Sequence, residues 1–169
     1  RLDYLAHSIS IPTGNSLSWK VDNTEYLKIE NNQVTLLKRP TDELVSGTLT
    51  ASLGDMNYSY PLSITADLGG DGSEGNPYQI KTAKQFSYFA TMVAGGETYE
   101  GKYFKLINDL DMQGNKFTPS IPVGAKDNPF QGTFDGNKKV IDNFYYSTET
   151  TSAAGLFSYV GINGTIKDL

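Results

Sequence analysis

The amino-acid sequence predicts an all-β fold with one helix, in which a β-sandwich precedes the start of a β-helix-like repeat domain. Three observations predict it. Apolar and polar residues alternate at short intervals through residues 1–66, a stretch rich in Gly and Asp follows at 67–76, and a Gly-containing strand pattern occurs twice between residues 130 and 169. We therefore expect a sandwich at 1–66, a linker at 67–76 and a repeat domain at 77–169.

Six runs within residues 1–66 have the period-two alternation of half-buried strands. Their apolar positions are Ile9 and Ile11; Leu17, Trp19 and Val21; Leu27 and Ile29; Val34 and Leu36; Leu49, Ala51 and Leu53; and Tyr58, Tyr60, Leu62 and Ile64. Asn31-Asn32 is typical of a tight hairpin turn. Trp19, the one tryptophan, is expected to fill the core. Pro61 predicts that the last strand lies at a sheet edge or carries a bulge.

The stretch at 67–76 has four glycines and three acidic residues and no strand or helix periodicity, which favours a linker. Asp67, Asp71 and Glu74 also offer oxygen ligands for calcium. Their spacing lacks the pattern of a dedicated calcium loop, so the plain linker is the favoured interpretation.

One segment, near residues 82–94, has helical periodicity. Thr82 and Gln85 form a capping-box pattern at its start, and Gly95-Gly96 predicts its end. Phe86, Phe89 and Val93 fall on one face, together with two alanines. We expect this face to cover the open end of the first coil, because terminal repeats need a cap.

The repeat pairs a Gly-x-Phe element, at 132–134 and 155–157, with an Ile-polar-polar-apolar element at 141–144 and 166–169. The spacing between the two copies of each element is typical of one solenoid coil. The predicted ladders place Leu106 or Ile107, Ile141 and Ile166 on one line, Leu110, Phe144 and Leu169 on another, and Phe134 over Phe157. The alternative is coincidence between two Gly-rich hairpins.

The predicted last strand ends near Leu169 with no polar cap, charged tail or helix after it to cover its edge. We expect either further coils in a longer chain or a second copy at this edge, that is, edge-mediated self-association.

Composition excludes several function classes. A net charge of −5 and a pI near 4.8 argue against a nucleic-acid partner. The absence of cysteine excludes disulfides and thiol chemistry. No apolar run is long enough for a membrane-spanning helix, and no signal peptide is recognisable.

Candidate catalytic residues are few. His7 is the single histidine, which disfavours a Ser-His-Asp device and His-ligated metals. Asp109 and Asp111 would share a strand face, with Asp135 or Asp142 on a neighbouring coil, and paired acids of this kind catalyse glycoside hydrolysis. The alternative, which we favour, is that these Asp residues close turns through local hydrogen bonds. We therefore predict no catalytic, cofactor-binding or metal-binding residue.

Several tyrosines are expected at the surface, where they suit sugar or protein recognition. The candidates are Tyr88, Tyr99, Tyr103, Tyr145 and Tyr146. The alternative is that half or more of them cover loops or join the core. The pattern does not define a glycan site.

Residues 5–66 resemble the reduced immunoglobulin-like domains of secreted bacterial proteins. The resemblance lies in 9–12, in Leu17 to Asn23 with its Ser-x-Trp strand, in 27–29 and in Val34. It implies an immunoglobulin-like sandwich that acts as a spacer.

Residues 69–169 resemble the GLUG-motif family of bacterial surface and secreted proteins. The matching segments are Gly-x-Gly-x-x-x-x-Pro-Tyr-x-Ile at 70–80, the helix at 82–93, and the stretches at 101–106, 109–112, 130–137 and 154–157. Phe117 departs from the pattern, which often has Trp there. The resemblance implies a β-helix-like domain without catalytic residues.

The function expected from these features is a non-catalytic module for adhesion or ligand display, extracellular or on the outer surface of a bacterium. Its partner would be a glycan or protein on a host or cell surface. Two alternatives stay open: an accessory region of a larger secreted glycoside hydrolase or peptidase, and an enzyme that uses Asp109 and Asp111.

Overall fold

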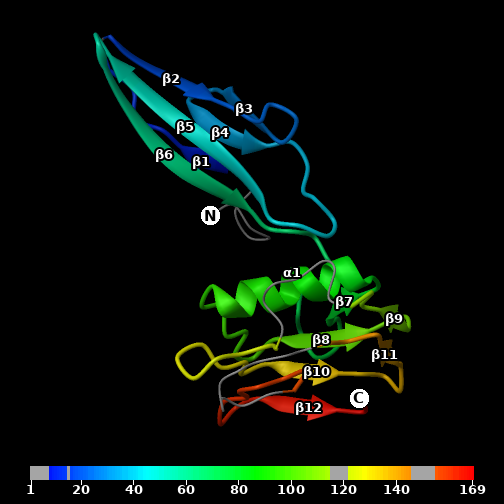
Figure 1. Ribbon diagram of the computed structural model, residues 1–169. Helices are drawn as coiled ribbons and strands as arrows, with labels where there is room; N and C mark the ends of the chain where they lie inside the picture. Colours follow the sequence, from blue (N-terminus) through cyan, green and yellow to red (C-terminus); the bar gives the residue numbers. More distant parts are fainter. Residues whose placement is uncertain (1–7, 15, 115–121, 146–154) are drawn as a thin grey trace. The chain divides into compact units, whose positions relative to one another are not determined.

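The computed structural model describes residues 8–14, 16–114, 122–145 and 155–169. The chain divides into two compact units, residues 1–67 and 68–169 (Figure 1). The described residues form twelve strands and one helix. The chain therefore belongs to the all-β class with a single helix, as the alternation pattern predicts.

The first unit consists of two antiparallel sheets that share one core. Its strands are β1 (Ser8–Ser10), β2 (Leu17–Val21), β3 (Leu27–Glu30), β4 (Gln33–Leu36), β5 (Val45–Leu53) and β6 (Met56–Ile64). The sheet orders are β1-β4-β3 and β2-β5-β6. Leu27 and Val34 from one sheet and Leu49, Leu62 and Ile64 from the other belong to the same buried cluster. This shared core makes the unit a sandwich.

Local signals predicted the turns and the edge of the first unit. Asn31 and Asn32 have φ of 50° and 57° and join β3 to β4, which confirms the tight turn. Pro61 lies in β6, an edge strand. The two-residue loop between β5 and β6 makes Leu53 and Met56 a hydrogen-bonded pair, and alternation along the ladder places Pro61 where an N–H would face the open edge. The proline therefore costs the ladder no bond.

Trp19 is only half buried. Its ring packs against the core cluster, and its Nε1 donates to the Pro12 carbonyl at 2.7 Å. Tyr58 and Tyr60, predicted to face the core, do lie on the inner face of β6 but are exposed. The reason is strand length, because β5 and β6 have nine residues each and the strands of the facing sheet have at most four.

The second unit is a stack of parallel strands beside one helix. Its elements are β7 (Tyr78–Ile80), α1 (Ala83–Ala94), β8 (Tyr103–Leu106), β9 (Leu110–Asp111), β10 (Thr133–Asp135), β11 (Ile141–Asp142) and β12 (Thr165–Lys167). A four-stranded sheet has the order β12-β10-β8-β7, and β11 pairs with β9. All these pairings are parallel. Each turn of the chain thus adds a strand beside the previous one.

The register of the stack differs from the prediction. Ile166 pairs with Phe134, and Ile141 pairs with Leu110, so the predicted pairing of Ile141 with Ile166 is wrong. Phe157 forms a bridge with Val123 instead of occupying the Phe134 ladder. The rings of Phe134 and Phe157 still touch, with centroids 5.2 Å apart.

The repeat that sets the register is Gly-Thr-apolar-charged, at 132–135 and again at 164–167. Thr133 pairs with Thr165 of the following coil and with Tyr103 of the preceding one. The Gly-x-Phe at 155–157 belongs to another side of the coil. The shorter spacing from Phe134 to Phe157 therefore misled the prediction.

The helix α1 begins and ends as predicted. Thr82 is the N-cap and its Oγ1 accepts from the Gln85 N–H at 3.1 Å, while Gln85 Oε1 accepts from the N–H of Lys81, one residue before the cap. The end is a Schellman motif, in which the Gly96 N–H donates to Val93 and the Glu97 N–H to Met92.

The helix packs on the strand stack through its apolar side. Phe86, Phe89 and Val93 are fully buried, and the Phe89 ring lies 4.6 Å from that of Phe104 in β8. Within the second unit, α1 lies at the β7 end of the sheet and β12 at the other end (Figure 1). This confirms that the predicted face contacts the strands.

The predicted linker is largely a folded loop of the second unit. Residues 68–76 belong to that unit, Leu68 is buried, and the N–H groups of Asp71 and Gly72 both donate to the Asn76 carbonyl. Gly70 has a φ of 71°, and a Cβ there would lie 2.1 Å from the Pro77 carbonyl oxygen. Glycine in this loop therefore permits a tight backbone fold and does not indicate a flexible linker.

Candidate functional site

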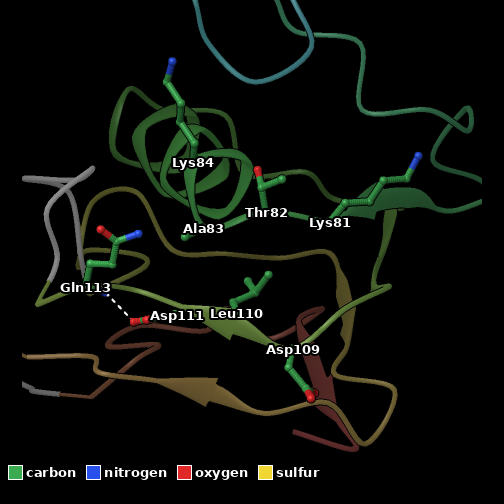
Figure 2. A pocket seen from close by; sticks show the side chains of 8 residues that line it. All are labelled: Lys81, Thr82, Ala83, Lys84, Asp109, Leu110, Asp111 and Gln113. Carbon is green, nitrogen blue, oxygen red and sulfur yellow. Dashed lines mark hydrogen bonds between the residues drawn. The ribbon is translucent and has the colours of Figure 1, made fainter.

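The candidate site is a shallow hollow of about 280 Å³ at the start of α1. Figure 2 shows the side chains that line it, which come from the segment around the N-cap and from β9 with the turn after it. They are Lys81, Thr82, Ala83, Lys84, Asp109, Leu110, Asp111 and Gln113. The acid pair predicted from the sequence thus lies beside the N-terminus of α1. The sequence did not indicate that these two features are close in space.

Both carboxylates of the acid pair are hydrogen-bond acceptors in the framework. Asp109 Oδ1 accepts from the N–H of Val140, a residue of the next coil, at 2.9 Å. Asp111 Oδ1 accepts from the Gln113 N–H and from Asn143 Nδ2, each at 2.9 Å; the first of these bonds is drawn in Figure 2. The acids therefore join successive coils and close a turn.

The hydrogen bonds set the charge state of Asp111. The Asn143 side chain, and after it the Gln113 N–H, hold the pKa of the Asp111 carboxyl below its ordinary value. A general acid at neutral pH needs a raised pKa. Asp111 is instead suited to remain an ionised acceptor.

The other two predicted acids lie in different sheets of the second unit, Asp142 in the β11-β9 pair and Asp135 in the four-stranded sheet. Asp142 is the register partner of Asp111, so the structure brings these two together. Asp135 lies in β10, where Oδ1 accepts from the Asn137 N–H at 2.8 Å and Oδ2 lies 3.6 Å from Lys167 Nζ. Among the described residues, no group of three or more Asp, Glu, His or Cys side chains is arranged to hold a metal ion.

In Figure 2 the ends of Lys81 and Lys84 point away from Asp109 and Asp111. The hollow therefore offers hydrogen-bond acceptors, and the pKa of one acid of the pair, Asp111, is lowered.

Stability should depend on pH through Asp111. Because its folded pKa is lowered, its contribution is complete above the ordinary value of 3.8 and is lost as pH falls through the folded pKa. We expect the melting temperature of the second unit to fall more steeply below about pH 4 in the wild type than in Asp111→Asn. Thermal melts from about pH 5 to about pH 2 measure this, and superimposable pH profiles would contradict it.

The predicted surface tyrosines have mixed outcomes. Tyr145 is exposed, whereas Tyr88 is buried and Tyr99 packs edge-on against Phe104 at 4.7 Å. Tyr103 is half buried in β8. His7, Phe117 and Tyr146 lie outside the described residues.

Sequence reasoning missed an exposed apolar surface on the first unit. It is the uncovered half of the inner face of the β2-β5-β6 sheet, here called the aromatic face. Its residues are Leu17, Trp19, Leu53, Met56, Tyr58 and Tyr60. The alternation that gives these residues one face is visible in the sequence, but the shortness of the covering sheet is not.

Comparisons with known proteins give distant relatives. No family model matches the chain, and no solved structure matches it significantly. The chain is 31% identical over 104 residues to a "Putative Gly-rich membrane protein" of Evansella cellulosilytica, which covers 60% of this chain and 12% of that protein. It is 27% identical over 115 residues to Halomucin of Haloquadratum walsbyi, covering 63% of this chain and 1% of that protein. The chain thus spans a small part of each relative.

The single helix of the described residues has 12 residues, too few to cross a membrane.

Proposed function

We propose that the chain is a non-catalytic module for adhesion or ligand display in a bacterial surface or secreted protein. The observation that carries the proposal is the use of Asp109 and Asp111 as framework acceptors. Their bonds to the Val140 and Gln113 amides and to the Asn143 side chain occupy the one acid pair for which the sequence offered a catalytic role. The geometry of a solenoid turn explains these bonds without a reaction.

The fold agrees with the two family resemblances. In the second unit, each successive coil adds a parallel strand in register, and two of these strands carry the Gly-Thr-apolar repeat. These features support a β-helix-like domain of GLUG type. Two antiparallel sheets around one core support an immunoglobulin-like sandwich. Spacer and repeat domains of this kind act through their exposed faces, which the rigid fold holds in place.

The names of the relatives favour a location at the cell surface. One is named a membrane protein and the other Halomucin. We place this chain outside the cell, with a glycan or protein of a host or cell surface as its partner. The acidic composition favours neither nucleic acid nor other polyanions.

The test is an array of glycans and host matrix proteins, probed with the wild-type chain and with a variant in which Asp109→Asn and Asp111→Asn are combined. Asn keeps a side-chain oxygen as acceptor, so we expect the same binding pattern from both proteins. We also expect no hydrolysis of polysaccharide or peptide panels by either. Hydrolysis by the wild type that the double variant lacks would overturn the proposal, as would the absence of any bound partner.

A further inference from the structure

The aromatic face is an exposed apolar surface that the proposed function leaves unexplained in the first unit. Leu53, Met56, Tyr58 and Tyr60 are 42%, 53%, 52% and 47% exposed. Trp19 lies beside them, its ring centroid 6.2 Å from that of Tyr60. Contiguous exposed apolar residues on a folded protein mark interaction sites.

The face is uncovered because the two sheets have unequal lengths. The β3–β4 hairpin turns at Asn31-Asn32, where the Asn32 carbonyl accepts from the Ile11 N–H. Beyond this point β5 and β6 continue to their own turn at Gly54-Asp55, and no strand of the described residues faces them there. Eight residue steps separate Met56 from Ile64, so the face begins about 27 Å from the end of β6 that leads out of the unit.

Three of the four edge strands of the same sandwich, β6, β3 and β2, carry a proline or charged residues; the fourth, β1, is Ser-Ile-Ser. Pro61 removes an outward N–H from β6, and β3 and β2 carry Lys28 with Glu30 and Lys20. Charged residues and prolines are the devices that keep edge strands unpaired. Strand pairing is therefore disfavoured at these three edges, which favours a contact through a face of the unit.

The chemistry of the face favours an apolar protein surface over a sugar. Trp, Tyr and Met are enriched at the centres of protein interfaces, where charged residues are depleted, and none of the six residues is charged. Sugar recognition needs convergent polar groups. Here Trp19 Nε1 already donates to Pro12, and the Tyr58 hydroxyl to Met56 Sδ.

We propose that the aromatic faces of two copies of this chain pack against each other in a weak symmetric dimer. A two-fold contact needs a self-complementary patch, and an uncharged face meets no like charge in its own copy. Leu53, Met56, Tyr58 and Tyr60 are about half exposed, and Leu17 and Trp19 less so. At roughly 100 Å² for a half-exposed large side chain, complete burial of the six residues of both copies removes on the order of 1,000 Å² from solvent, the lower limit of specific interfaces. We therefore expect a dissociation constant on the order of 100 µM.

This inference deepens the proposed display function, on which its biological setting rests. Copies held close together on a surface would associate through their sandwich ends, because a high local concentration favours weak contacts.

The experiment is sedimentation velocity of the full chain from about 10 µM to about 1 mM. We expect the sedimentation coefficient of the wild type to rise with concentration, and that of Tyr58→Lys to remain that of a monomer. Ser59→Lys is the matched control, since it places the same charge one residue along β6 on the opposite sheet face. It should associate like the wild type. Thermal melts check that both variants fold.

A monomeric wild type at about 1 mM would overturn the proposal, and so would equal loss of association in the two variants. If the wild type stays monomeric and Tyr58→Lys loses binding to a glycan or matrix protein on the array, the face serves another ligand. In that case the dimer is wrong while the proposed display function stands, so the two failures are distinguishable.

Discussion

Replacing Phe89 by alanine is expected to destabilise the second unit by about 3 to 5 kcal/mol. Phe89 is fully buried, and its ring is within contact distance of six other aromatic rings. These are the rings of Phe86, Tyr99, Phe104, Phe130, Phe134 and Phe157. They come from the helix, a loop and three successive coils, so the cavity left by the substitution cannot close by the movement of one element.

Calorimetric unfolding measures this effect, because the two units have separate cores. The transition of the second unit should move to lower temperature, and that of the sandwich should stay in place. Thr91→Ala is the control, since Thr91 lies on the exposed side of α1 and surface substitutions stay within about 0.5 kcal/mol. Equal melting of Phe89→Ala and Thr91→Ala would show that the helix does not hold the coil stack together.

Features determined by neighbours in the chain were predictable from the sequence. The cap at Thr82 and the Gly95-Gly96 end depend on residues within one helical turn, and both appear in the structure. The six strands of the sandwich follow from period-two alternation, and the turn at Asn31-Asn32 from residues that tolerate positive φ.

Features determined by distant partners were not predictable in the same way. The inward direction of Tyr58 and Tyr60 was correct, but their exposure depends on how far the other sheet extends. The linker prediction used the abundance of glycine, whereas the loop at 68–76 depends on which carbonyls those glycines approach. In both cases the missing quantity was the position of a segment remote in sequence.

The candidate site shows the same division. Residue type allowed two roles for Asp109 and Asp111. The sequence could not show the hydrogen bonds that they accept from Val140 and Asn143 of the next coil. The local turn-closing bond favoured from the sequence is present at Asp111, which accepts from the Gln113 N–H, whereas the bonds from Val140 and Asn143 run between coils. The closeness of Asp142 to Asp111 depends on the register between β9 and β11.

The register between successive coils depends on the glycine of the Gly-Thr-apolar repeat, which occurs twice in the sequence. Gly132 and Gly164 occupy equivalent positions in successive coils, before the paired residues Thr133 and Thr165. A Cβ at Gly132 would lie 2.6 Å from the Tyr99 carbonyl oxygen and 2.7 Å from that of Lys102. At Gly164 it would lie 2.6 Å from the Phe130 carbonyl oxygen. At both positions the backbone of the preceding coil leaves no room for a side chain.

Gly132→Ala is therefore expected to destabilise the second unit by about 3 kcal/mol, the upper range for overpacking. The clash is with backbone oxygens that cannot rotate away, and relief requires separating β10 from β8. Hydrogen exchange of the Thr133 amide, which donates to the Lys102 carbonyl at 2.8 Å, measures the loss when it is followed at increasing denaturant concentration.

Gly75→Ala is the matched control, because no atom lies within 4 Å of a Cβ built there and its φ is not in the left-handed region. It should change stability by no more than about 0.5 kcal/mol. If Gly132→Ala were equally mild, the coils would be able to separate at this point without cost. The glycine of the Gly-Thr-apolar repeat would then be needed only to form the turn. The register would not depend on the close approach of successive backbones.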